Sequence, residues 1–203
     1  MNSNEINIKE NEIFERYCSV AKPLMTELKV RMHDNKIPLH CLNEIRAIND
    51  HISRCYRDDV IEKDFEYRKA EGHLRRLTFD CFKHLNILLY DKIARYEKKY
   101  FSAYWTKIDG GLFWRNYLVY KQKAMFATIE AKKIETFDPE KSMGLYQEAY
   151  LNYHEIEKLL NKKKYFFLKS FLAKWLFYSK GALQWIIQSI ILTIISTIIL
   201  FLL

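Results

Sequence analysis

Few residues of this chain stand in a pattern that could do chemistry, and the clearest pair is an arginine and a histidine. Arg46 is followed by four residues and then by His51. The sequence contains no glycine-rich phosphate loop, no G-x-S-x-G motif and no H-E-x-x-H motif. Arg46 and His51 are therefore the candidate catalytic residues.

Helix geometry limits what these two side chains could do within one chain. Five residues correspond to about 500° of rotation, so Arg46 and His51 lie roughly 140° apart around a helix axis. One chain cannot easily gather them into a pocket, whereas two chains facing each other could. Asp50 lies four residues from Arg46, and Glu44 lies seven from His51, so ordinary ion pairs are available to both. Catalytic, structural and ligand-contact roles are all open for the pair.

Metal and cofactor sites are not expected. The chain has four cysteines but no C-x-x-C pair, which favours reduced thiols over a disulfide or zinc framework. His33 lies near His40 and Cys41, but no second ligand pair completes a zinc site. We therefore expect neither a metal nor another cofactor.

Apolar residues at three-to-four spacing predict helices along most of the chain. A first helix is expected over 4–32, with a kink or restart at Pro23. A loop over 34–38 and a second helix after it follow from Pro38. The expected core positions of these two helices are Ile6, Ile13, Tyr17, Val20, Leu24, Leu28, Leu42, Ile45, Ile48, Ile52 and Tyr56.

The later helices are separated by recognisable turns. A third helix is expected from about residue 58 to 105, interrupted only by Gly72. The sequence Asp109-Gly110-Gly111 predicts a turn, and a fourth helix is expected over 112–136. The sequence Asp138-Pro139-Glu140 then predicts the start of a fifth helix that reaches Lys163. The body of the chain is thus expected to be an α-helical bundle.

The end of the chain has a different character. Residues 181–203 include no charged side chain, and as a helix they would extend roughly 34 Å, enough to cross a bilayer core of about 30 Å. Residues 161–180 are rich in aromatic and basic side chains, as is typical of a headgroup zone. The lysines there are Lys162, Lys163, Lys164, Lys169, Lys174 and Lys180.

These features predict a membrane protein in three parts: a helical bundle over 1–160, a juxtamembrane segment over 161–180 and a transmembrane helix over 181–203. The six lysines account for most of the net charge of +8. The positive-inside rule then places the N-terminal domain in the cytoplasm.

Polar side chains interrupt the apolar segment. Such groups are costly in lipid unless they meet water or a partner, although hydroxyls can also bond to carbonyls of their own helix. A single span cannot enclose a channel, so permeation would require a homo-oligomer. The polar residues are Gln184, Gln188, Ser189, Thr193, Ser196 and Thr197.

The stretches LNEIRAINDHISRCYRDD (42–59) and AEGHLRRLTFDCFKHL (70–85) resemble the HEPN superfamily, helical-bundle proteins that carry an R-x(4–6)-H motif. In its active ribonucleases two motifs meet across a dimer interface, and cleavage needs no metal. The resemblance implies that His51 is a general acid or base and that Arg46 stabilises phosphate charge. Ala47 stands where active members commonly have a polar residue, so an assembly or ligand contact is also open.

A divergent HEPN-like domain with a membrane segment resembles the small accessory membrane proteins of type VI-B CRISPR systems. That resemblance implies a location at the bacterial inner membrane and an antiphage function, in which a homo-oligomer forms a membrane pore and enhances an RNA-guided ribonuclease. The expected partners are the lipid bilayer, copies of the same chain, and RNA or the RNA-guided ribonuclease, with no DNA. A membrane-tethered ribonuclease dimer and a passive tail-anchored adaptor are the alternatives.

Overall fold

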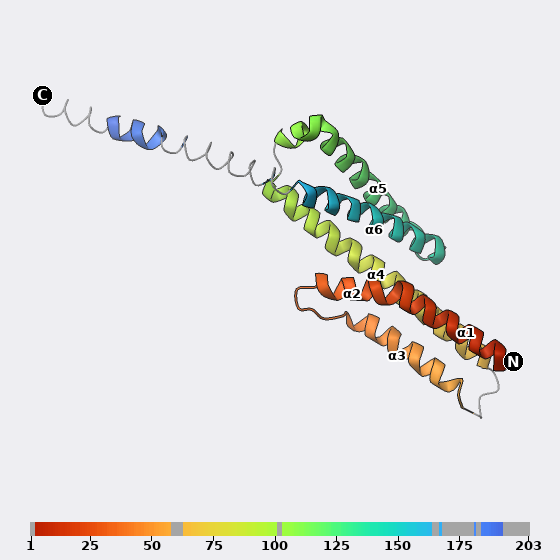
Figure 1. Cartoon of the computed structure of the whole chain (residues 1–203). Coiled ribbons are helices and arrows are strands. Elements are labelled where there is room, and N and C mark those ends of the chain that lie inside the picture. Colours follow the sequence, from red (N-terminus) through yellow and green to blue (C-terminus); the bar gives the residue numbers. More distant parts are fainter. Residues whose placement is uncertain are drawn as a thin grey trace, which may run out of the picture.

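A computed structural model describes residues 3–57, 63–100, 103–163, 167, 181 and 184–192 of the chain. The main elements are helices α1 to α6, a π-helical turn η1 and a 3₁₀ segment η2, and no β-strand occurs in these ranges. In Figure 1 the long helix α4 (Lys63–Tyr100) runs through the middle of the molecule. Helices α1 to α3 lie along its first half, and α5 and α6 lie along its second half.

The N-terminal helix consists of three consecutive segments: α1 (Ser3–Arg16), η1 (Tyr17–Ala21) and α2 (Lys22–Arg31). The loop after it includes residues 34–38, as the sequence predicts. Pro38 is the last residue before the next helix and has an extended backbone (ψ 138°). A proline restricts the residue before it to extended conformations, which explains why the loop ends there.

Pro23 does not break the N-terminal helix, because the helix widens just before it. The Lys22 N–H donates to the carbonyl oxygen of Tyr17, five residues back, which is the π-type pattern. The extra residue in this turn changes which side chains face inward. Ala21 is fully buried, whereas Val20, expected in the core, is 41% exposed.

Helix α3 (Leu39–Arg54) packs on α4 with a slightly different face from the expected one. Ile48 and Ile52 are buried as expected and Cys41 is buried as well, whereas Leu42 and Tyr56 are 44% and 64% exposed. Three-to-four spacing cannot distinguish which of two neighbouring positions is buried. The contact with α4 decides which side chains of α3 are buried.

Helix α4 has 38 residues and is continuous, which corresponds to a rod of about 57 Å. The interruption expected at Gly72 does not occur. The nearest neighbour to a Cβ at this position would be the end of the Arg76 side chain, at 3.8 Å. The buried face of α4 includes Leu74, Leu77 and Leu85, so tertiary packing along the whole length outweighs the local cost of one glycine.

The predicted turn before α5 is confirmed at the end of η2 (Ala103–Gly111). Asp109, Gly110 and Gly111 all have positive φ angles, of 51°, 65° and 92°. A Cβ at Gly111 would also lie 3.3 Å from the carbonyl oxygen of Thr106. Glycine fits this position because it meets neither the left-handed strain nor the close contact.

Helices α5 (Leu112–Ile134) and α6 (Pro139–Lys162) form an antiparallel pair (Figure 1). The turn between them confirms the predicted restart. The Asp138 carboxylate accepts a hydrogen bond from the Lys141 N–H at 3.0 Å, and proline occupies the first helical position. Both features are typical of a helix N-terminus.

Two groups of buried side chains hold the helices together, and both include residues of α4. The first joins α1 to α3 to the first two-thirds of α4 and also includes Ala131 of α5 and Tyr146 of α6. The second joins the end of α4 to η2, α5 and α6, and it centres on Trp105, which is fully buried. Phe167, from the segment expected in the headgroup zone, lies in this second core with its ring centroid 5.0 Å from that of Trp105.

The predicted fold class, an all-α bundle followed by a single C-terminal transmembrane helix, is wrong as stated. The described residues form helices and no strand, but none of these helices is long and apolar enough to cross a membrane. A span needs about 20 consecutive apolar residues in one helix, and none of the helices in the described ranges meets this requirement. Of 181–203, the structure describes residues 181 and 184–192.

Candidate functional site

The surface where α3 packs on α4 gathers histidine and carboxylate side chains. His51 on α3 lies with its Nδ1 2.6 Å from Oε2 of Glu66 on α4. Both side chains are largely buried, with 12% and 11% of their surface exposed. Two to three turns further along α4, His73 and Arg76 pair with Glu44 of α3, so the two helices present a line of paired charges.

A second histidine lies against the first. The rings of His51 and His73 are stacked with centroids 5.1 Å apart. His73 Nδ1 is 2.7 Å from Oε2 of Glu44, and Arg76 Nε donates to the same oxygen at 3.2 Å. Each imidazole is thus oriented by a carboxylate from the opposite helix.

The electrostatics of the His51–Glu66 pair favour the ionised carboxylate. The hydrogen bond to His51 lowers the pKa of Glu66, burial opposes this, and the charge of Lys69 lowers the pKa further. A carboxylate that accepts from Nδ1 fixes the ring and leaves Nε2 as the second functional nitrogen, which is the arrangement of a general acid or base. The pair could therefore support proton transfer at Nε2.

Arg46 and His51 are not brought together within one chain. Arg46 is exposed, and no ion pair links it to another residue among those described. The pair with Asp50 that the spacing allows is not formed, because Asp50 bonds to Arg54 at 2.6 Å. Any joint action of Arg46 and His51 would require a second copy of the chain.

Sequence reasoning missed the partners that orient these histidines. Glu66 is 15 residues from His51 along the chain, and Glu44 is 29 from His73. The available signal was the period of α4, since residues 66, 70, 73 and 77 share one helical face. Within the described chain, no group of three or more side chains of the usual ligand types could hold a metal ion.

The C-terminal helical run 184–192 lies apart from the helical body in Figure 1. Gln184 and Gln188 are exposed and Ser189 is partly exposed. Large apolar side chains alternate with them and are also exposed. Their exposed fractions are 70% for Trp185, 48% for Ile186, 49% for Ile187, 54% for Ile190, 50% for Ile191 and 67% for Leu192.

The remaining candidates are only partly described. Lys162 ends α6 and is exposed, and Lys163 Nζ pairs with Asp109 at 2.7 Å. The other residues singled out in the C-terminal part lie outside the described ranges. They are Lys164, Lys169, Lys174, Lys180, Thr193, Ser196 and Thr197.

Comparison with known proteins adds no relative to these observations. The chain matches no protein-family model, no curated protein and no solved structure. Its function is therefore inferred from its own residues and from the resemblances described above.

Proposed function

We propose that the protein is a membrane-associated effector of bacterial antiphage defence that works as a homo-oligomer. It binds the inner membrane from the cytoplasm, permeabilises the bilayer and thereby enhances an RNA-guided ribonuclease. The defence context rests on the resemblance to the type VI-B accessory proteins. Membrane binding rests on the exposed apolar side chains of residues 184–192.

Those side chains are the observation that carries the proposal. Contiguous exposed apolar surface marks sites of protein or membrane contact. Burial of a large apolar side chain contributes about 1.5–3 kcal/mol. Six such side chains, each roughly half to two-thirds exposed, would contribute on the order of 5–10 kcal/mol to lipid binding. Trp185 is also the residue type that prefers the membrane–water interface.

Charge acts in the same direction. Residues 161–203 contain six lysines and no acidic residue. Each basic residue near an anionic membrane surface adds about 1 kcal/mol of attraction at physiological salt. Apolar contact and charge together give the two signals that stable membrane attachment requires.

A double substitution tests membrane binding. We expect Trp185→Ser combined with Ile191→Ser to weaken binding to anionic vesicles by about 30-fold or more, because each change removes roughly 1–2 kcal/mol of lipid contact. Vesicle co-sedimentation measures binding, and release of an entrapped dye measures permeabilisation. In cells with the RNA-guided ribonuclease, the same variant should lose its effect on phage resistance.

Phe137→Ser is the matched control, because Phe137 is 89% exposed in the turn between α5 and α6. It should bind vesicles like the wild type. Equal loss in both variants, or a wild-type chain that stays monomeric in detergent and leaves vesicles sealed, would contradict the proposal. Light scattering in mild detergent gives the subunit number.

A second candidate function is metal-independent cleavage of RNA by a dimer. The His51–Glu66 pair favours it, because a histidine oriented through Nδ1 is prepared for proton transfer. In that function, Arg46 of one chain would lie near His51 of the other. Arg46 is exposed and carries no ion pair among the described residues, so it is available for such a contact.

Substitution of His51 tests this second candidate. General acid–base catalysis contributes about 10²–10⁴-fold, so we expect His51→Ala to lower the RNA cleavage rate at least 100-fold. His40→Ala is the control, since His40 lies on the same helix and stacks on His84. A wild-type chain without RNA cleavage, or an unchanged rate in His51→Ala, would exclude this function.

A further inference from the structure

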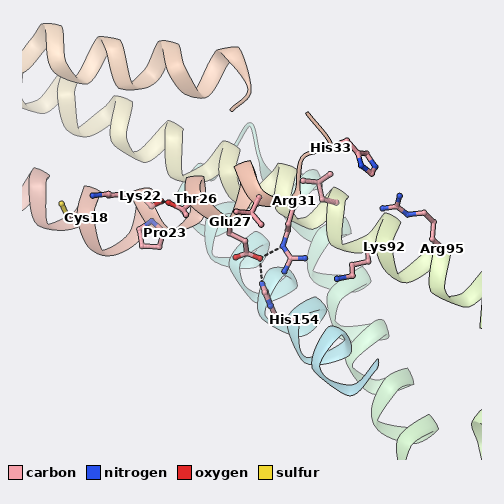
Figure 2. A pocket seen from close by; sticks show the side chains of 12 residues that line it. Cys18, Lys22, Pro23, Thr26, Glu27, Arg31, His33, Lys92, Arg95 and His154 are labelled. Carbon is pink, nitrogen blue, oxygen red and sulfur yellow. Dashed lines mark hydrogen bonds and ion pairs between the residues drawn. The ribbon is translucent and has the colours of Figure 1, made fainter. Parts of the chain in front are cut away.

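A large cavity lies away from the α3–α4 face, between the N-terminal helix, α4 and α6 (Figure 2). Its volume is about 1010 Å³, which matches the upper end of small-molecule sites, about 300–1,000 Å³. Most of the titratable side chains that line it are basic or imidazole groups. They are Lys22, Arg31, His33, Lys92, Arg95 and His154.

Three of these groups already have acidic partners. Arg31 donates to both carboxylate oxygens of Glu157, at 3.0 and 2.7 Å, and Lys92 donates to the same carboxylate. His154 Nε2 lies 2.8 Å from Oε1 of Glu27. These charges form an internal network that stiffens one wall of the cavity.

The other three have no acidic partner in the described part of the chain. Arg95 Nε donates only to the backbone carbonyl of Asp91, at 3.3 Å, which leaves its terminal nitrogens available. Figure 2 places His33 and Arg95 toward the same end of the cavity, near Lys92, and Lys22 toward the other. The single acidic lining residue, Glu27, is occupied by Arg31 and His154. The unoccupied charge of the cavity is therefore positive.

We infer that this cavity binds a phosphate-bearing small molecule, with its phosphate at the His33–Arg95 end. The planar donor fork of arginine suits phosphate oxygens. Val30 and Leu88 supply apolar wall for the uncharged part of the ligand. A nucleotide and a phospholipid headgroup share this chemistry. The site is independent of the membrane contact proposed for residues 184–192.

The local backbone supports a binding role. The π-turn that precedes Pro23 borders the cavity through Cys18. Single π-turns inside α-helices are rare and occur frequently at functional sites. In a regular α-helix the side chains before Pro23, including Cys18, would be rotated to a different position around the helix axis.

Substitution of Arg95 tests the inference on the full chain in detergent. The probes are ATP and inorganic phosphate in solution, followed by calorimetric titration, and phosphatidylglycerol vesicles by co-sedimentation. We expect Arg95→Gln to weaken binding of at least one probe by about tenfold, as for loss of a charge-assisted hydrogen bond. Arg115→Gln is the matched control, because Arg115 is exposed on α5 and does not line the cavity.

The outcomes separate the two sources of phosphate. Binding of ATP that depends on Arg95 identifies a soluble ligand. Vesicle binding that depends on Arg95, without binding of ATP, identifies a lipid headgroup. If neither depends on Arg95, or if Arg115→Gln has the same effect, the inference is wrong. The Trp185→Ser/Ile191→Ser chain should still bind ATP like the wild type, so failure of the membrane proposal would be seen separately.

Discussion

Arg31→Met is expected to lower the free energy of unfolding by about 2–4 kcal/mol, because it removes one member of a partly buried charge network. The side chains of Arg31, Glu27 and Glu157 are 17%, 23% and 13% exposed. Methionine keeps much of the volume of arginine but leaves both carboxylates without their guanidinium partner. Urea denaturation followed by circular dichroism measures the change.

The chain offers a matched control for this variant. Arg75 pairs with Glu140 at 2.7 Å, but the two side chains are 49% and 74% exposed. Exposed ion pairs contribute about 0–1 kcal/mol, so Arg75→Met should have little effect on the urea midpoint. Equal destabilisation by both substitutions would show that the network around Arg31 has no special role.

Acid is expected to weaken the same network. Burial would raise the pKa of Glu27, but hydrogen bonds from His154, Tyr150 and Arg31 outweigh it and lower the pKa to about 2. The hydrogen bond from Arg31, against burial and with help from Lys92, lowers the pKa of Glu157 to about 2 as well. The ordinary value for both is 4.5.

The sign of the pH effect follows from these shifts. Between pH 4.5 and 2 the unfolded chain binds more protons than the folded chain, so stability falls as the pH falls. After allowance for solvent screening, each carboxylate should contribute about 1–2 kcal/mol that is present above pH 4.5 and lost toward pH 2. Urea midpoints measured from pH 6 to pH 2.5 test this. Arg31→Met should show a shallower pH dependence, and an identical slope would contradict the assignment.

Local signals in the sequence predicted the turns of this protein well. The loop over 34–38, the turn at 109–111 and the start of α6 at Pro139 all depend on residues with restricted or unusual backbone angles. Such preferences act within a few residues and need no knowledge of the fold. The positions of these turns could therefore be predicted from the sequence.

The functional contacts depend on tertiary structure and could not be predicted in the same way. Arg31 and Glu157 are 126 residues apart in the chain. Spacing suggested Asp50 as a partner of Arg46 and Glu44 as a partner of His51, whereas in the structure Asp50 pairs with Arg54 and Glu44 with His73. The inward position of Ala21 results from the π-turn, which changes the helical phase that a periodic pattern assumes.

The hydropathy of the C-terminal segment led to the part of the predicted fold class that is wrong, a single transmembrane helix. Residues 181–203 satisfy a composition rule for a membrane span, yet none of the described helices meets the requirements of one. Composition reports the preferred surroundings of side chains, whereas a span is defined by one helix of about 20 apolar residues.

Helix α4 contributes to both cores, and this has a consequence for how the protein can be divided. A fragment that ends after α3 would lack the helix that covers its buried face, and a fragment that begins at α5 would lack the wall formed by Leu89 and Ile93. Neither fragment is therefore expected to fold as an independent domain. The described body of the chain should therefore unfold in a single thermal transition. A chimaera that replaces either half with an unrelated segment should lose both cores.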